Sequence, residues 1–294
     1  MSEPTTKYGI LVAVDGSAES DAAVRWATRE AVLHDAPVTL AHVVMPVVVT
    51  WPVASLQGSY NEWQEQNAQH VIEQAQKTLH ASLGEAQPPA VRTEVLHGYI
   101  LPALVDASKA AQMVVVGSRG MGAIGRTLLG SVSSGLAHHA RGPVAIVHAD
   151  EAQTPDHTSP VLLGIDGSPA SEAATALAFD EASRRGVELI ALHAWSDVGI
   201  FPVLGMDWRQ YEDEGHEILG ERLAGWQERY PDVTVRRRIV CDRPARWLID
   251  ESAKAQLVVV GSRGRGGFPG KLLGSVGTAV AQSAKSPVVV VRPR

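Results

Sequence analysis

The sequence predicts an α/β fold made of two tandem, doubly wound domains, each with a five-stranded parallel sheet in the strand order 3-2-1-4-5. Two observations predict this fold. Long segments of the first half of the chain return in the second half in the same order. Within each half, short apolar runs alternate with longer helix-like segments, which is typical of parallel sheets covered by helices.

The internal repeat consists of three matched pairs of segments. "ILVAVDGSAESDAAVRWATREA" (10–31) matches "VLLGIDGSPASEAATALAFDEA" (161–182) at an offset of 151 residues. "AQMVVVGSRGMG" matches "AQLVVVGSRGRG", and "LLGSVSSGLAHHARGPVAIV" matches "LLGSVGTAVAQSAKSPVVVV", both at an offset of 144. We therefore expect a first domain over residues 1–148, a polar, proline-containing linker over 149–159 and a second domain over 160–294.

The apolar runs predict the strands. Four of the five runs in each copy are almost wholly apolar, as in strands covered by helices on both faces. The third run alternates ("VRTEV" and "VTVRRRIV"), which favours an edge strand and hence the order 3-2-1-4-5. The predicted strands are Ile10–Val14, Val38–Val43, Val91–Leu96, Met113–Val116 and Val144–Val147, then Val161–Ile165, Glu188–His193, Val233–Val240, Leu257–Val260 and Val288–Val291.

Helix-start signals agree with this layout. Ser17 and Ser168 are suited to cap the first helix of each copy, because a serine side chain accepts a hydrogen bond from an unpaired N–H of the first turn. Pro102 and Pro244 suit the first turn of the third helix, where a missing N–H costs nothing. The sheet then reverses its winding between strands one and four, where a ligand crevice opens at the carboxyl ends.

Composition narrows the class of protein. The 294 residues are 45% hydrophobic and carry a net charge of -6 without a basic run, so neither nucleic acid nor an anionic membrane surface is an expected partner. No apolar run is long enough to span a membrane, and "MSEPTTKYG" lacks the layout of a signal peptide, so a cytoplasmic location is expected. The single cysteine, Cys241, excludes an internal disulfide and is expected to pack at a strand end.

A glycine pattern follows the fourth strand of both copies. Glycine lets successive backbone N–H groups turn towards a ligand, and the Gly-Ser pair opens the fourth helix, whose N-terminus favours phosphate. The Ser131 and Ser275 hydroxyls could add a contact to phosphate or to Mg²⁺. The alternative interpretation is a tight strand-to-helix turn without a ligand. The pattern is Gly-x2-Gly-x9-Gly-Ser, at Gly117, Gly120, Gly130 and Ser131 and again at Gly261, Gly264, Gly274 and Ser275.

Two familiar phosphate motifs do not explain this turn. Residues 120–125 spell GxGxxG, but no acidic residue follows about 20 positions later and Pro269 breaks the second copy. A P-loop is also excluded, since Arg265 and Leu272 stand where it needs glycine and serine or threonine.

Together with an aspartate that ends strand one in "VDGS" and "IDGS", the glycine pattern resembles the ATP-binding branch of the universal stress protein family. The resemblance covers both halves of the chain. It implies one ATP per domain, with adenine near strands one and two and the phosphates on the glycine turn. It also implies a homodimer. Asp-Gly-Ser is equally typical of a turn that leads into a helix, so Asp15 and Asp166 have a structural alternative.

The resemblance assigns site residues in both copies. In the first copy, Ala13 and Asp15 are expected beside the base and ribose, and Val43 in the adenine pocket. The methyl group of Ala13 stands where the second copy has Gly164 and is expected to crowd the base there. The remaining residues expected to hold the nucleotide are Gly117, Ser118, Arg119, Gly120, Met121, Gly122, Ala123, Gly130, Ser131 and Val132, with Gly164, Asp166, Ala194, Gly261, Ser262, Arg263, Gly264, Arg265, Gly266, Gly267, Gly274, Ser275 and Val276 in the second copy.

The histidines do not suggest a metal site. His138 and His139 are adjacent on a predicted helix and therefore point about 100° apart. His42 and His193 occupy equivalent places in strand two and are expected to make a local hydrogen bond.

The expected function is an ATP-binding stress-response regulator that signals by occupancy, with little or no turnover, because no recurrent base, nucleophile or carboxylate cluster accompanies the crevice. The alternative is a slow ATPase or an autophosphorylating enzyme of the same fold. An adenylating ATP pyrophosphatase is disfavoured because "DGS" is not its phosphate loop, and a scaffold with empty pockets is disfavoured by the intact glycines. Gly117→Val or Gly261→Val is expected to weaken ATP binding in a chain that stays folded.

Overall fold

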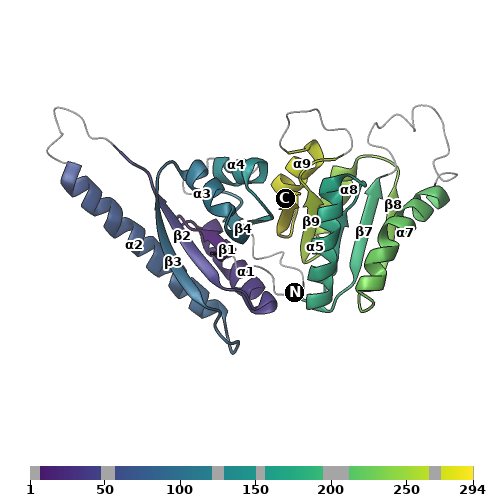
Figure 1. The fold of residues 1–294 in the computed structure, drawn as a ribbon, viewed down its shortest axis with the longest axis horizontal. Helices are drawn as coiled ribbons and strands as arrows, with labels where there is room; N and C mark the ends of the chain where they lie inside the picture. Colours follow the sequence, from purple (N-terminus) through teal and green to yellow (C-terminus); the bar gives the residue numbers. More distant parts are fainter. Residues whose placement is uncertain are drawn as a thin grey trace. The chain divides into compact units, whose positions relative to one another are not determined.

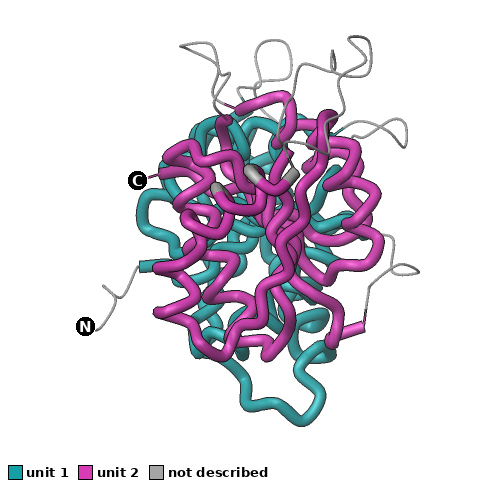
Figure 2. Tube along the Cα trace, turned by 90° about the vertical axis from the view of Figure 1, so that its right-hand side faces the viewer, with its two compact units in different colours: residues 1–149 teal, residues 150–294 magenta. Residues whose placement is uncertain are grey.

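The computed structural model describes residues 7–47, 57–120, 129–149, 156–194, 212–264 and 273–293. The chain divides into two compact units, Met1–Ala149 (unit 1) and Asp150–Arg294 (unit 2), coloured separately in Figure 2. Each unit is a parallel sheet flanked by helices (Figure 1). None of the described helices is both long and apolar enough to cross a bilayer.

Unit 1 follows the predicted alternation of strands and helices. Its strands pair in the order β3-β2-β1-β4-β5, all in parallel, which confirms the predicted order and places β3 at an edge. Its elements are β1 (Gly9–Ala13), α1 (Ala18–His34), β2 (Val38–Val44), α2 (Gln57–Ser82), β3 (Val91–His97), α3 (Ile100–Ser108), β4 (Ala111–Gly117), α4 (Ser131–His139) and β5 (Val144–Val147).

Unit 2 repeats this topology. Its strands pair in parallel in the order β8-β7-β6-β9-β10, with β8 at the edge. Its elements are β6 (Val161–Gly164), α5 (Pro169–Arg185), β7 (Leu189–Ala194), α7 (Glu212–Arg229), β8 (Val235–Val240), α8 (Pro244–Ser252), β9 (Leu257–Gly261), α9 (Ser275–Ser283) and β10 (Val288–Val291).

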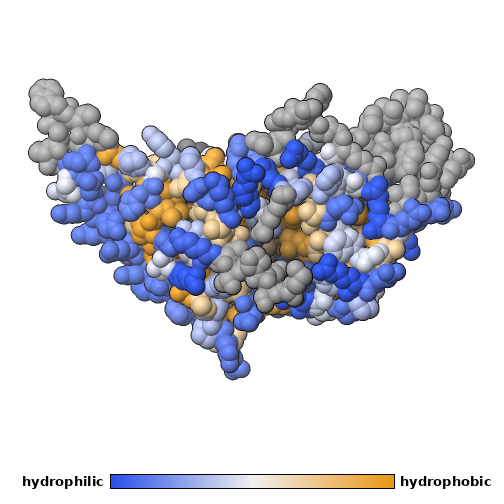
Figure 3. Space-filling view, in the orientation of Figure 1, coloured by the Kyte–Doolittle hydropathy of each residue, from blue (hydrophilic) through white to orange (hydrophobic). Residues whose placement is uncertain are grey.

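The core of each unit lies between its sheet and its helices. In unit 1, α1 packs with α2 against one face and α3 packs with α4 against the other. The central strands are therefore buried on both faces, and Leu11, Val12 and Val115 are fully excluded from solvent. The edge strand β3 is less covered, and Figure 3 shows hydrophobic residues reaching the surface of unit 1 over β2 and β3, beside the hydrophilic α2.

The helix-start signals identified in the sequence are present. Ser17 Oγ accepts from the N–H of Ser20 at 3.2 Å, and Ser168 Oγ accepts from the N–H of Ser171 at 3.2 Å. Pro244 is the first residue of α8, as predicted. These caps place the N-termini of α1 and α5 directly after β1 and β6, at the carboxyl edge of each sheet.

Gly117, the last residue of β4, lies against the first turn of α1. A Cβ built on Gly117 would stand 2.7 Å from the carbonyl carbon of Glu19, and one on Gly261 would stand 2.7 Å from that of Ala170. Backbone atoms cannot move aside as a flexible side chain can, so both glycines are required for strand-to-helix packing whether or not a ligand binds. The expectation that a valine here leaves the fold undisturbed is therefore revised.

We predict that Gly117→Val lowers the free energy of unfolding by about 1–3 kcal/mol, because the added side chain overpacks a backbone contact. Chemical denaturation followed by circular dichroism measures this. The matched control is Gly58→Ala in α2, whose added Cβ meets no atom within 4 Å. The control is expected to be neutral or stabilising by up to about 1 kcal/mol. Equal stability of Gly117→Val and the unaltered chain would contradict the packing role.

Candidate nucleotide-binding site

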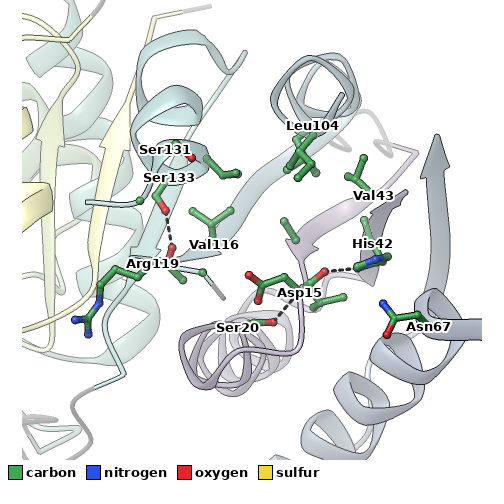
Figure 4. A pocket seen from close by; sticks show the side chains of 18 residues that line it. Asp15, Ser20, His42, Val43, Asn67, Leu104, Val116, Arg119, Ser131 and Ser133 are labelled. Atoms are coloured by element: carbon green, nitrogen blue, oxygen red, sulfur yellow. Dashed lines mark hydrogen bonds between the residues drawn. The ribbon is translucent and has the colours of Figure 1, made fainter. Parts of the chain in front are cut away.

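A cavity of about 450 Å³ opens in unit 1 at the carboxyl ends of β1 and β4 (Figure 4). These are the two strands between which the sheet reverses its winding, where ligands bind in doubly wound sheets. Its volume lies within the range of about 300–1,000 Å³ that is usual for small-molecule sites.

One side of the cavity is apolar. Leu104 on helix α3 and Val116 on strand β4 are buried side chains that face the cavity (Figure 4). Val43, near the end of β2, also lines this wall. Ala13 at the end of β1 completes this wall. A flat, uncharged group such as a purine could be buried here without leaving a polar protein group unsatisfied.

The opposite side is polar and is built on the loop after β1. Asp15 Oδ1 accepts from both the N–H (3.0 Å) and the hydroxyl (2.6 Å) of Ser17, and the N–H of Asp15 donates to Ser20 Oγ at 3.3 Å. Gly16 between them has a φ of +83°, a conformation that favours glycine. Asp15 is thus a turn residue and a cavity residue at once, so the two interpretations of Asp-Gly-Ser are compatible.

The glycine turn closes onto the start of α4. Gly130 donates its N–H to the carbonyl of Ser118 at 2.8 Å, and Ser133 Oγ donates to the carbonyl of Gly117 at 2.7 Å. The N–H groups of Ser131, Val132 and Ser133 have no acceptor within the helix, since they belong to its first turn. A helix N-terminus in this state favours an anion.

Gly120 allows the aspartate and the turn to meet. A Cβ on Gly120 would stand 2.6 Å from Asp15 Oδ2, so any larger residue would displace the carboxylate. Arg119 lies beside it, and its Nη2 is 2.9 Å from Glu19 Oε1.

Most residues expected in the first site come together around the cavity. The lining includes Ala13, Asp15, Val43, Gly117, Arg119, Gly120, Gly130, Ser131 and Val132. Ser118 is buried, is not among the lining residues, and its hydroxyl has no hydrogen-bond partner within the described part of the chain. Met121, Gly122 and Ala123 lie outside the described residues.

The repeated domain organisation is matched by known proteins. The model of the Universal stress protein family matches residues 9–148 and, a second time, residues 157–292. The chain belongs to the universal stress protein family. A universal stress protein of Mycolicibacterium smegmatis is 62% identical over 294 residues, which is 100% of both chains. One of Mycobacterium tuberculosis is 52% identical over 293 residues, which is 99% of both chains.

Solved structures agree on the fold. The crystal structure of a universal stress protein from Archaeoglobus fulgidus covers 97% of this chain and 98% of its own, with a TM-score of 0.71 at 20% identity. This tandem universal stress protein therefore shares its fold with a protein of only 20% sequence identity.

Sequence reasoning missed about half of the cavity wall in unit 1. Four of the missed residues lie inside the repeated segments, and five come from segments outside them, of which only some carry a signal. Ile100 and Leu104 are four apart on α3, a spacing that turns both towards the sheet. Asn67, on α2, has no such signal. The missed lining residues are Val14, Ser20, Ala41, His42, Asn67, Ile100, Leu104, Val116 and Ser133.

His42 lines the cavity and makes the expected local hydrogen bond. Its Nδ1 is 2.8 Å from the carbonyl of Val14, and Nδ1 of His193 is 2.7 Å from the carbonyl of Ile165 in unit 2. A carbonyl oxygen only accepts, so Nδ1 carries the hydrogen in both rings.

Unit 2 reproduces the polar half of this arrangement. Gly274 donates to the carbonyl of Ser262 at 2.8 Å, and a Cβ on Gly264 would stand 2.5 Å from Asp166 Oδ2. A Cβ on Gly164 would stand 3.0 Å from Leu248 Cδ1, so the space that this glycine frees is partly taken by leucine. Of the other residues expected here, Ala194 ends β7, Gly261 ends β9, Ser275 and Val276 begin α9, Ser262 is buried, Arg263 is exposed, and Arg265, Gly266 and Gly267 lie outside the described residues.

Cys241 follows β8 and lines a separate cavity of about 400 Å³ with Asp242 and Trp247. Its thiol is free. Burial raises the pKa of the Cys241 thiol, and the negative charge of Asp242 raises it further. The thiolate is the nucleophilic form, so the raised pKa makes this thiol less reactive at neutral pH.

We predict that iodoacetamide alkylates Cys241 in the folded chain about two- to fivefold more slowly at pH 8 than in the denatured chain. Asp242→Asn should speed the reaction in the folded state, since removal of the charge lowers the pKa. The difference should shrink as the pH rises above the raised pKa and both thiols ionise. Mass spectrometry of the modified chain measures the rate, and faster alkylation of the native protein would contradict the prediction.

Proposed function

We propose that the chain is a nucleotide-binding regulatory protein that holds one ATP in each unit and turns it over slowly or not at all. The observation that carries the proposal is the cavity of unit 1, which joins an apolar slot to a glycine turn, an arginine and a helix N-terminus in one continuous space. A nucleotide is a ligand class that joins a flat base to a polyanion in one molecule.

The residues suggest how ATP would lie. The base would occupy the slot between Ala13, Val43 and Leu104, with the ribose towards the Asp15 carboxylate. The phosphates would meet the free N–H groups at the start of α4, in reach of Arg119. The Ser131 hydroxyl and the phosphate oxygens are the hard ligands that Mg²⁺ prefers, so the ion could accompany ATP here.

Binding is favoured over turnover by the groups around the cavity. Among the described residues that line it, Asp15 is the carboxylate, and its Oδ1 is already engaged by Ser17. His42 donates Nδ1–H to Val14 rather than to a serine hydroxyl. The Ser17 hydroxyl that bonds to Asp15 caps α1 and is not among the residues that line the cavity, so neither Asp15 nor His42 is paired with a hydroxyl nucleophile of the described cavity wall, which autophosphorylation would need. Occupancy, in a cytoplasmic homodimer, would then be the signal.

We predict that Asp15→Asn and Asp166→Asn each weaken ATP binding in their own unit by about tenfold, because hydrogen bonds to a charged acceptor are stronger than those to an amide. Asparagine keeps an acceptor for Ser17 or Ser168, so the turn is retained. Isothermal titration calorimetry should resolve two binding events in the unaltered chain and one strong event in each variant.

The control is Asp106→Asn, an exposed residue of α3 that pairs with Lys109, and it should leave ATP binding unchanged. Absence of ATP binding to the unaltered chain, with or without Mg²⁺, would contradict the proposed function. Several turnovers per minute in a phosphate-release assay would favour the alternative of an ATPase.

A further inference from the structure

The two units share the backbone contacts that close the strand-to-helix turn. The Gly117–Glu19 contact and the Gly261–Ala170 contact are both 2.7 Å, measured from the position of a built Cβ to the carbonyl carbon. The hydrogen bond that closes the glycine turn is 2.8 Å in both units. Glu19 and Ala170 therefore occupy the same place on the first turn of α1 and α5, as the sequence offset of 151 also requires.

Charge at that place differs. In unit 1, Glu19 Oε1 lies 2.9 Å from Arg119 Nη2, and the two side chains are only 17% and 24% exposed. In unit 2, Ala170 has no carboxylate to offer to Arg263, the counterpart of Arg119. Arg263 is exposed and forms no ion pair within the described part of unit 2. Among the described residues, Arg119 thus has a carboxylate partner and Arg263 has none.

Among the described residues, a second arginine lies near the aspartate loop of unit 2. Arg222 of α7 stands where α2 of unit 1 has Val71. Its guanidinium lies directly against Gly167, in the space that a Cβ on that glycine would need, whereas Val71 meets Gly16 with a methyl group. Arg222 therefore places a positive charge against the loop that carries Asp166, whereas the residue at the matching position of unit 1, Val71, is uncharged.

From these differences we propose that the two units select nucleotides of different phosphate charge: unit 2 prefers the triphosphate, and unit 1 discriminates much less between ATP and AMP. This inference rests on the proposed nucleotide-binding function. In unit 2, each additional phosphate gains a charge-assisted hydrogen bond from Arg263, which has no ion-pair partner in the described part of the chain, and electrostatic attraction from Arg222. In unit 1, a phosphate must compete with Glu19 for Arg119, and separating that shielded pair leaves a carboxylate uncompensated.

One consequence is a division of roles within a single chain. Unit 2 would respond to the ratio of ATP to AMP, because only its affinity depends strongly on the phosphate number. Unit 1 would be occupied by adenine nucleotides whatever their phosphate number. Glu19 and Ala170 determine the specificity, because one provides a carboxylate for the arginine of the glycine turn and the other does not. In unit 2 the phosphates would be attracted by Arg263 and by Arg222 of α7.

Calorimetric titration with ATP and with AMP tests this. Asp166→Asn weakens unit 2 and so reports on unit 1, and Asp15→Asn reports on unit 2. The ratio of ATP to AMP affinity should be about five- to tenfold higher for unit 2 than for unit 1. Glu19→Gln, added to the Asp166→Asn chain, should raise the ratio of ATP to AMP affinity in unit 1 by about three- to tenfold. Ala170→Glu, added to the Asp15→Asn chain, should lower this ratio in unit 2 by a similar factor.

A further variant and a stability control keep the test independent of folding. Arg222→Val introduces the residue type of unit 1 and should also lower the ratio for unit 2. Thermal unfolding by circular dichroism checks that each chain is folded. The inference would be overturned if both units had the same ratio of ATP to AMP affinity, or if the substitutions changed ATP and AMP affinity equally. Either result would leave the proposed nucleotide binding intact. Loss of all nucleotide binding in the unaltered chain would overturn both proposals.

Discussion

The close approach of β4 to the first turn of α1 is the contact on which the site of unit 1 depends. Only glycine at position 117 permits it, since a Cβ would meet the backbone of Glu19. The contact fixes where α1 begins relative to the end of β4. It thereby brings the Asp15 loop against the glycine turn, where Gly120 makes room for the carboxylate. The cavity between them follows from these two close approaches rather than from any single side chain.

The same constraint operates in unit 2 through Gly261 and Gly264. Backbone contacts of this kind tolerate little change, because an added atom has nowhere to go in a close-packed interior. Side chains beside these backbone contacts are not fixed by them. The two units therefore keep the same turn glycines and yet differ at Glu19 and Ala170, and at Val71 and Arg222.

Much of the fold could be predicted from the sequence. The strand order followed from the internal repeat, the apolar runs and the alternating third strand. A strand buried on both faces is apolar throughout, whereas a strand buried on one face alternates between apolar and polar residues. Ser17 and Ser168 cap their helices as expected, since this interaction spans only three residues. Asp15 and the glycines of the first turn were found because the repeat preserves their spacing.

What the sequence by itself determined was therefore local: the strands, the caps, the repeated motif and its place at the carboxyl edge of the sheet. Only the tertiary structure showed that Arg119 is compensated by Glu19, one hundred positions earlier, and that Arg222 lies against Gly167. It also showed that Gly117 and Gly261 have a packing role and that α2 and α3 supply part of the cavity wall. Periodicity and spacing report how a residue relates to its neighbours in the chain. Charge compensation and close approach depend on distances between residues far apart in the chain, and those arise only when the elements pack.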